Sequence, residues 1–222
     1  MTTLAMRKPH ADRGIEGVLA KWYAVNTGEM MNQYVDLARR ISNQIPPGSA
    51  VLEVAPGPGY FSIELAKLGS YAITGLDISH SMVKIASKKA DEAGVCVDFK
   101  QGSAAKMPLQ RNSFDFLLCR AAFKNFAQPA QALREMRRVL RPGGRALIID
   151  LRRDVSMREI NRYVDSLGLG FFSRWFTSLS FRFMLLRRAY TVAGMQQLLA
   201  PIGFASTRID TNAIGMEIWL EK

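Results

Sequence analysis

Two apolar segments with strand-like sequences end in residues that are suited to binding a nucleoside. Residues 50–54 lead into a loop that contains Gly57 and Gly59, and residues 72–77 end in Asp77. Because glycine has no Cβ, the backbone of this loop can approach a ligand closely or adopt positive φ. Open parallel sheets bind nucleotides at the carboxyl ends of their strands, where a carboxylate can accept hydrogen bonds from both ribose hydroxyls. The pattern predicts a nucleoside site formed by the loop and Asp77.

The loop departs from the pattern that binds dinucleotides. That pattern is Gly-x-Gly-x-x-Gly, and its third glycine lets the following helix pack closely on the strand. After Gly59 this chain continues with two aromatic residues and a serine, so the third glycine is missing. Glu53 lies inside the apolar run, two residues before the loop begins at Ala55. A carboxylate there is poorly suited to a pyrophosphate but suits a ligand with a cationic amino group and a sulfonium.

These residues resemble the class I S-adenosylmethionine-dependent methyltransferases, and most closely the branch of quinone-biosynthesis C-methyltransferases. The stretch 53–59 is similar to the family's acid-x-Gly-x-Gly-x-Gly element, with Ala55 in place of the first glycine. Asp77 matches the family's ribose-binding acid. Residues 101–115 are similar to its third and fourth strand region, and residues 138–145 to the turn into its fifth strand. The glycine loop alone is weak evidence for the family, but four elements in this order make the resemblance specific.

The resemblance implies S-adenosylmethionine as the cofactor and assigns residues to it. The loop and the acid before it should face the methionine half, and Asp77 should bind the ribose. Residues after Asp77 should pack on the adenine, and residues after the third strand should contact its edge. The cofactor-binding residues predicted in this way are Glu53, Ala55, Gly57, Gly59, Asp77, Ile78, Met82, Ser103 and Ala104, together with Arg120 at the end of the fourth strand.

Methyl transfer from a sulfonium is an in-line displacement, so positioning and exclusion of water can supply much of the catalysis. Such an enzyme needs at most a base, and we assign no catalytic residue. Many relatives carry a histidine pair near positions 124 and 125, where this chain has Lys124 and Asn125. Tyr23, Tyr34 and Lys124 are predicted to contact the substrate, and Arg120 is also a candidate for binding an acidic group of it.

Alternating strand and helix patterns place these residues on a parallel sheet. The predicted fold class is α/β, a Rossmann-like, seven-stranded and mostly parallel sheet with an antiparallel last strand, N-terminal helices and a helical lid insertion after strand 5. A single domain over 1–222 should contain an N-terminal helical segment, a cofactor-binding core, the lid insertion, and a closing helix with a hairpin. These parts are predicted at residues 1–48, 49–150, 151–190 and 191–222.

The insertion combines aromatic residues with interspersed arginines. It leaves the carboxyl end of the fifth strand, beside the expected cofactor, so we interpret it as a lid over an apolar substrate pocket. Phe172, Trp175 and Phe176 are the residues predicted to line that pocket. The alternatives are a helix on a membrane surface, an amphipathic helix that closes the core, and a dimer contact.

The composition describes an ordinary globular protein of 222 residues with a formal net charge of +11. Every basic residue from position 134 to 188 is an arginine, which favours an anionic partner or a solvated basic face. Apolar patterns predict strands at residues 95–100 and 114–119, which contain Cys96 and Cys119. Both cysteines are predicted to be reduced core thiols, without metal-site spacing. The polar, basic first residues and the lack of a long apolar run predict no signal peptide, no spanning helix and a cytoplasmic protein.

The function predicted from the sequence is methyl transfer from S-adenosylmethionine to a small, substantially apolar molecule by a monomer or homodimer. One alternative is an RNA methyltransferase that uses the arginine-rich face, although nucleic acid is the less favoured partner because no nucleic-acid module is evident. A second is an NAD(P)-dependent oxidoreductase on a similar fold, against which the missing glycine counts. A third is a protein that binds the cofactor without catalysis.

Overall fold

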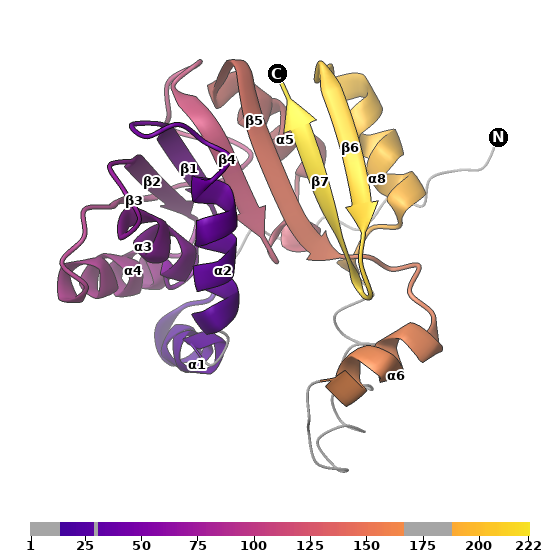
Figure 1. The fold of residues 1–222 in the computed structure, drawn as a ribbon, viewed down its shortest axis with the longest axis horizontal. Helices are drawn as coiled ribbons and strands as arrows, with labels where there is room; N and C mark the ends of the chain where they lie inside the picture. Colours follow the sequence, from indigo (N-terminus) through magenta and orange to yellow (C-terminus); the bar gives the residue numbers. More distant parts are fainter. Residues whose placement is uncertain (1–13, 29–30, 167–187) are drawn as a thin grey trace.

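The computed structural model describes residues 14–28, 31–166 and 188–222. Within them a twisted seven-stranded sheet carries helices on both faces (Figure 1). The elements are α1 (Gly17–Gly28), α2 (Met31–Ser42), β1 (Ala50–Val54), α3 (Tyr60–Ala66), β2 (Ala72–Asp77), α4 (His80–Glu92), β3 (Asp98–Gln101), β4 (Phe114–Arg120), η1 (Phe123–Asn125), α5 (Pro129–Val139), β5 (Leu140–Leu151), α6 (Met157–Ser166), α8 (Val192–Leu199), η4 (Ala200–Ile202), β6 (Ser206–Thr211) and β7 (Gly215–Glu221).

The strands lie in the order β3-β2-β1-β4-β5-β7-β6. The first five are parallel to one another, and β7 is antiparallel to both β5 and β6. This arrangement confirms the predicted α/β fold class, including its antiparallel last strand. Because β1, β2 and β4 are adjacent and parallel, the residues that follow them meet at one edge of the sheet.

Alternate residues of each central strand enter two separate cores, as the period of two in a strand requires. Leu52 and Leu117 contribute to the core under α5 and α8. Val51 and Leu118 contribute to the core under α2 and α3. Glu53 follows this alternation onto the α2–α3 face at the carboxyl end of β1, where its Cα pairs with that of Leu118.

Strand β3 is shorter than the sequence predicted, because the end of α4 takes up residues assigned to it. Gly94 adopts φ +66°, and the Val95 amide donates to the Ala90 carbonyl at 3.1 Å, which completes the last turn of the helix. The strand therefore begins at Asp98 rather than at residue 95. Cys96 lies in the connection between α4 and β3 and is exposed, so its predicted position in the core is wrong. Cys119 in β4 is buried, as predicted.

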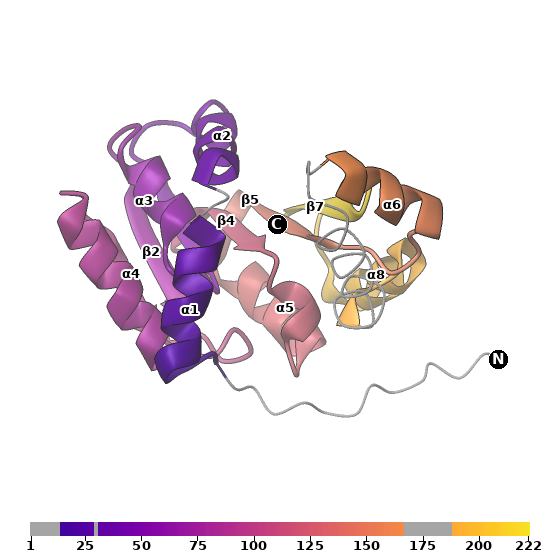
Figure 2. The same ribbon diagram turned by 90° about the horizontal axis from the view of Figure 1, so that it is seen from below.

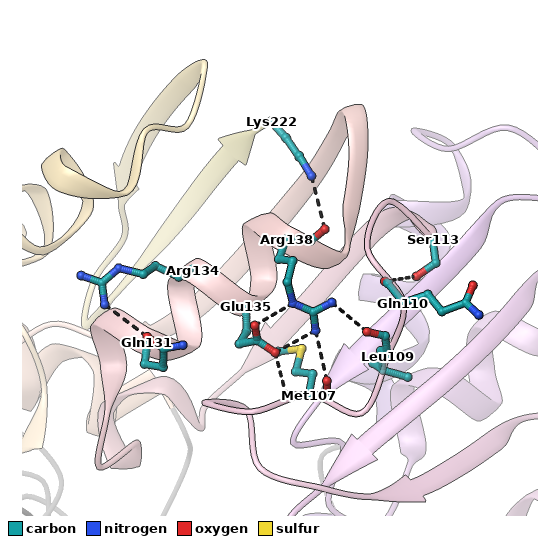
Figure 3. A network of polar contacts seen from close by, with 9 residues as sticks. All are labelled: Met107, Leu109, Gln110, Ser113, Gln131, Arg134, Glu135, Arg138 and Lys222. Carbon is teal, nitrogen blue, oxygen red and sulfur yellow. Dashed lines mark hydrogen bonds and ion pairs between the residues drawn. The ribbon is translucent and has the colours of Figure 1, made fainter.

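A polar network holds the connection between β3 and β4 against α5 (Figure 3). The Arg138 guanidinium donates to the carbonyls of Leu109 at 2.8 Å and Met107 at 3.1 Å. It also pairs with the Glu135 carboxylate, which accepts from the Met107 amide at 2.8 Å. These bonds fix a stretch whose sequence carried part of the family resemblance, and they give it a structural role.

Two helical segments lie beyond the edge of the sheet where β1, β2 and β4 end. Figures 1 and 2 show α1 at this edge, and Figure 1 shows α6, the start of the predicted insertion, beyond the same edge. Phe172, Trp175 and Phe176 fall outside the described residues. Among the helices that are described, none has both the length and the apolar sequence that crossing a membrane requires.

Candidate functional site

A cavity of about 570 Å³ opens at this edge, within the range of ~300–1,000 Å³ common for ligand pockets. Its walls come from the loops after β1, β2 and β4, from α1 and α2, and from the segment that precedes α1. Six of the predicted cofactor-binding residues line it at the ends of β1 and β2, namely Glu53, Ala55, Gly57, Asp77, Ile78 and Met82.

Asp77 lies at the end of β2 with both carboxylate oxygens engaged by backbone amides. Oδ2 accepts from the Gly57 amide at 3.0 Å, and Oδ1 accepts from the Ser79 amide at 2.9 Å. The side chain is buried, and that burial raises the pKa of the carboxyl group above its usual value despite these bonds. A carboxylate fixed in this way presents its remaining lone pairs to the cavity as acceptors for paired hydroxyls.

Glu53 reaches the cavity from inside β1. Its Oε2 accepts from the Ser62 hydroxyl at 2.6 Å and from the Ser62 amide at 3.2 Å, so the first turn of α3 positions it. Burial raises the pKa of Glu53 from 4.5 to about 7, and the Ser62 bonds oppose this shift only in part. A buried acid with such a pKa favours a cationic ligand group that would restore its charge.

The loop after β1 adopts left-handed backbone at the positions where the family pattern has glycines. Ala55 has φ +57°, although its Cβ makes this conformation costly, and Gly57 has φ +55°. Gly59 has φ +78° and starts α3, and a Cβ there would lie 2.6 Å from the Phe99 ring. Gly57 faces the cavity, whereas Gly59 allows close packing of the helix on its neighbours.

Arg120 adds a cation to the cavity wall, at the end of β4. Its Nη2 donates to the Gln33 side-chain oxygen at 2.8 Å, and its guanidinium lies 4.4 Å from the centre of the Tyr34 ring. Tyr34 and Tyr23 also line the cavity, and burial raises the pKa of both phenols, so both are neutral donors at neutral pH. The cavity thus combines two carboxylates (Glu53 and Asp77), two guanidinium groups (Arg120 and Arg188) and two phenols.

The segment before α1 closes the cavity through contacts that the sequence did not reveal. The Glu16 carboxylate accepts from the amides of His80 and Ser81 at 3.0 Å each, at the start of α4. The Ser79 hydroxyl donates to the Ile15 carbonyl at 2.6 Å, and Gly14 is close enough that a Cβ would lie 2.6 Å from that of Ser79. The N-terminal segment is thereby fixed beside the end of β2.

Lys124 lies behind the cavity wall rather than in it. Its ammonium donates to the Ala121 carbonyl at 2.6 Å and to Asp150 Oδ1 at 2.9 Å, and both members of this ion pair are buried. The other oxygen of Asp150 accepts from the Lys124 amide at 2.8 Å. The pair fixes the turn after β4 against the end of β5, so Lys124 helps to position this turn. Its predicted contact with the substrate stays a prediction.

Three predicted cofactor residues do not line this cavity, and their assignment stays a prediction. Gly59 packs against Phe99, and Ser103 and Ala104 lie in the turn after β3, where the Ser103 hydroxyl accepts from the Ala105 amide at 3.2 Å. The cavity contains residues that sequence reasoning missed, namely Gly14, Ile15, Ala121, Ala122, Phe126 and Arg188. The two alanines follow a buried strand at the same edge, so strand-end logic could have found them.

Comparison with known proteins assigns the part of this chain from β1 to β5 to a protein family. Residues 52–148 match the model of a family described as "Methyltransferase domain". Residues 52–148 form a methyltransferase domain. Its bounds run from β1 to β5 and include Glu53, Asp77 and Arg120, whereas Arg188, the fourth charged residue of the cavity, lies outside them.

Two bacterial proteins show the relationship of this methyltransferase domain in sequence. The demethylmenaquinone methyltransferase of Deinococcus radiodurans is 40% identical over 101 residues, which is 45% of this chain and 42% of that protein. The ubiquinone/menaquinone biosynthesis C-methyltransferase UbiE of Bdellovibrio bacteriovorus is 36% identical over 104 residues, or 46% of this chain and 44% of that protein. The chain thus matches less than half the length of these relatives. They confirm the predicted resemblance to the quinone-biosynthesis branch.

Solved structures extend the likeness beyond the methyltransferase domain at the level of the fold. A Methanococcus maripaludis protein assigned as an S-adenosylmethionine-dependent methyltransferase superposes with a TM-score of 0.78 at 23% identity, over 99% of this chain and 97% of that one. An S-adenosylmethionine-dependent methyltransferase from Aquifex aeolicus gives 0.64 at 19% identity, over 83% and 88%. At these identities the likeness shows the fold, and both neighbours are named for the predicted cofactor, S-adenosylmethionine. The predicted enzyme class is that of the family that residues 52–148 match.

The residues of the cavity fit that cofactor. S-adenosylmethionine carries a ribose, an ammonium, a carboxylate and a sulfonium, and the cavity offers a group of complementary chemistry to each polar part. Asp77 can accept from ribose hydroxyls, Glu53 can pair with a cation, and Arg120 can pair with an anion. Among the described residues, no group of three His, Cys, Asp or Glu side chains could hold a metal ion.

Proposed function

We propose that the whole chain transfers a methyl group from S-adenosylmethionine to a small, substantially apolar acceptor. The observation that carries this proposal is the meeting of Glu53, Asp77 and Arg120 in one cavity of a methyltransferase domain. The names of the two bacterial relatives, which refer to demethylmenaquinone and to ubiquinone and menaquinone biosynthesis, support an apolar acceptor.

Glu53, Asp77 and Arg120 would each bind a different group of the cofactor or the acceptor. Asp77 would hold the ribose, because the Gly57 and Ser79 amides already fix its carboxylate. Glu53 would pair with the ammonium of the methionine half, and Arg120 with its carboxylate or with an acidic group of the acceptor. S-adenosylmethionine would supply a methyl group on a good leaving group, so the protein's task is to align the acceptor and exclude water.

The aromatic part of the cavity wall would receive the acceptor. Tyr23, Tyr34 and Phe126 supply aromatic surface there, and Asn125 and Arg188 supply polar groups. The two tyrosines could also donate a hydrogen bond to a phenolic group of the acceptor or accept one from it, since burial raises the pKa of their own phenols and keeps them protonated. The lid residues Phe172, Trp175 and Phe176 remain part of this proposal, but they lie outside the described residues.

The proposal is tested by transfer of a radiolabelled methyl group from S-adenosylmethionine. Purified protein is incubated with a panel of apolar phenols and hydroquinones, with total RNA, and without acceptor. We expect organic-extractable label with at least one apolar acceptor and no such product from the Asp77→Ala variant. Label in RNA alone would instead support the nucleic-acid alternative. S-adenosylmethionine binding without transfer to any acceptor would support a protein that binds the cofactor only.

A further inference from the structure

Helix α1 exposes an apolar face to solvent. Its inner side is buried through Ala20 and Ala24, which are 0% and 5% exposed. The side chains that form the outer face are exposed to 64% or more, and their spacing in the sequence places them on one side of the helix. This outer face of α1 consists of Val18 (82% exposed), Leu19 (68%), Trp22 (64%) and Val25 (74%).

Such a face is unusual for a helix on the surface of a globular protein. Surface helices normally bury an apolar stripe and expose a polar face on the opposite side. A helix that is apolar all round is found in a core or in a membrane. Scattered exposed apolar residues need no explanation, but a contiguous patch marks an interaction site. A tryptophan among aliphatic residues is the composition that favours the interface between lipid headgroups and acyl chains.

The charge around α1 favours an anionic surface. The twelve residues of the helix include no acid, and Lys21 is exposed beside the outer face. The acid immediately before the helix, Glu16, is held by the amides of His80 and Ser81, where the start of α4 offsets its charge. The whole chain carries a formal net charge of +11, which adds long-range attraction to negative lipid headgroups.

We propose that the outer face of α1 binds the surface of an anionic phospholipid bilayer. The four apolar side chains would enter the boundary between headgroups and acyl chains, with Lys21 at headgroup level. Tyr23, on the next side of the same helix, lines the cavity, so bound α1 would place the cavity beside the lipid. An apolar acceptor dissolved in the bilayer could then reach the site without crossing water. The binding itself rests on α1 alone and stands apart from the proposed methyl transfer.

Vesicle flotation of the full chain tests the proposal. We expect the protein to float with vesicles of phosphatidylcholine and phosphatidylglycerol, to float less with phosphatidylcholine alone, and to be released by salt. Leu19→Ser and Trp22→Ser should each lower the partition coefficient about tenfold, because one such side chain contributes more than 1.4 kcal/mol when buried. Both side chains are exposed in the protein, so the variants should fold. Leu68→Ser, which changes an exposed leucine elsewhere, is the matched control and should bind as the wild type does.

Tryptophan fluorescence gives a second readout that does not depend on variant stability. The chain has three tryptophans, so in Trp22→Phe the other two remain as an internal reference. Wild-type emission should shift to the blue on addition of anionic vesicles, and most of this shift should be lost in Trp22→Phe. Unchanged partitioning of Leu19→Ser and Trp22→Ser would overturn the proposal. So would a wild-type dimer that these substitutions dissociate without any vesicle binding, since a second copy would then cover the face.

Discussion

The Asp77 carboxylate accepts a hydrogen bond from the Gly57 amide at 3.0 Å, which joins the end of β2 to the glycine loop after β1. The bond spans twenty residues of sequence and places the predicted ribose acid under the loop predicted to bind the methionine half. One side chain therefore both shapes the loop and faces the cavity. Its removal should affect the protein in both ways.

Asp77→Ala should weaken the binding of S-adenosylmethionine and S-adenosylhomocysteine. Loss of a charged hydrogen-bond acceptor costs roughly 1.5–3 kcal/mol, or about a tenfold to a hundredfold in affinity. Titration calorimetry measures the change, with Asp98→Ala in the exposed part of β3 as the matched control. Equal affinities of Asp77→Ala and wild type would remove Asp77 from the ribose site.

The two glycines of the loop should respond differently to substitution. At Gly57 a Cβ would meet only the Tyr23 ring at 3.8 Å, so Gly57→Val should lose only roughly 1–2 kcal/mol through its positive φ, and should fold but fill space that the cofactor needs. At Gly59 a Cβ would lie 2.6 Å from Phe99 and 3.0 Å from Ala86. Gly59→Ala should therefore lose roughly 2–5 kcal/mol of stability through strain and overpacking.

Urea unfolding and cofactor titration separate the two effects. Gly57→Val should retain most of its unfolding free energy and lose binding, whereas Gly59→Ala should show the larger loss of unfolding free energy. Normal cofactor binding by folded Gly57→Val would mean that the loop has only a structural role.

Glu53 should make stability depend on pH. Its pKa is about 7 in the folded protein, against the ordinary value of 4.5 that we take for the unfolded chain. Between these values the unfolded chain has lost the proton that the folded protein keeps, so stability falls as pH rises through this window. The fall attributable to Glu53 should reach about 3 kcal/mol. Urea unfolding from pH 4.5 to pH 7.5, compared between wild type and Glu53→Gln, isolates this component. Identical slopes for the two proteins would show that Glu53 titrates normally.

The buried Lys124–Asp150 pair should behave as a unit. Asp150→Ala removes the carboxylate that pairs with the buried Lys124 ammonium, and loss of one partner of a buried pair costs about 3–5 kcal/mol. Lys124→Met combined with Asp150→Ala should cost less than the sum of the single changes. A double-mutant cycle in urea measures the coupling, and the exposed Arg208–Asp210 pair, expected near ~0–1 kcal/mol, is the control. Additive effects at Lys124 and Asp150 would contradict the coupling.

The fold could be predicted from the sequence because its signals are local. Apolar runs of strand length alternate with helical periodicity, and this alternation fixes a parallel sheet with few alternatives. The start of β3 could not be predicted, because the turn that ends α4 at Gly94 uses residues with an apolar sequence. The pattern alone does not show whether Cys96 continues a strand or belongs to that turn.

The candidate site could be predicted in part for a similar reason. Glu53, Asp77 and Arg120 come at the ends of adjacent parallel strands, so topology alone brings them to one edge. Ile15 accepts a hydrogen bond from Ser79, which lies 64 positions away, and Gly14 packs against the same residue. The local sequence around residues 14 and 15 gives no signal of these contacts. Lys124 follows the fourth strand as expected, but the ion pair with Asp150 holds its ammonium behind the wall of the cavity.

A crystal structure of the protein with S-adenosylhomocysteine tests the central claim most directly. We predict that the ligand occupies the cavity between the loops after β1, β2 and β4, with both ribose hydroxyls hydrogen-bonded to Asp77 and the amino group beside Glu53. Gly57 should lie against the ligand. A ligand bound outside this cavity, or a ribose beyond hydrogen-bonding distance of Asp77, would contradict the account.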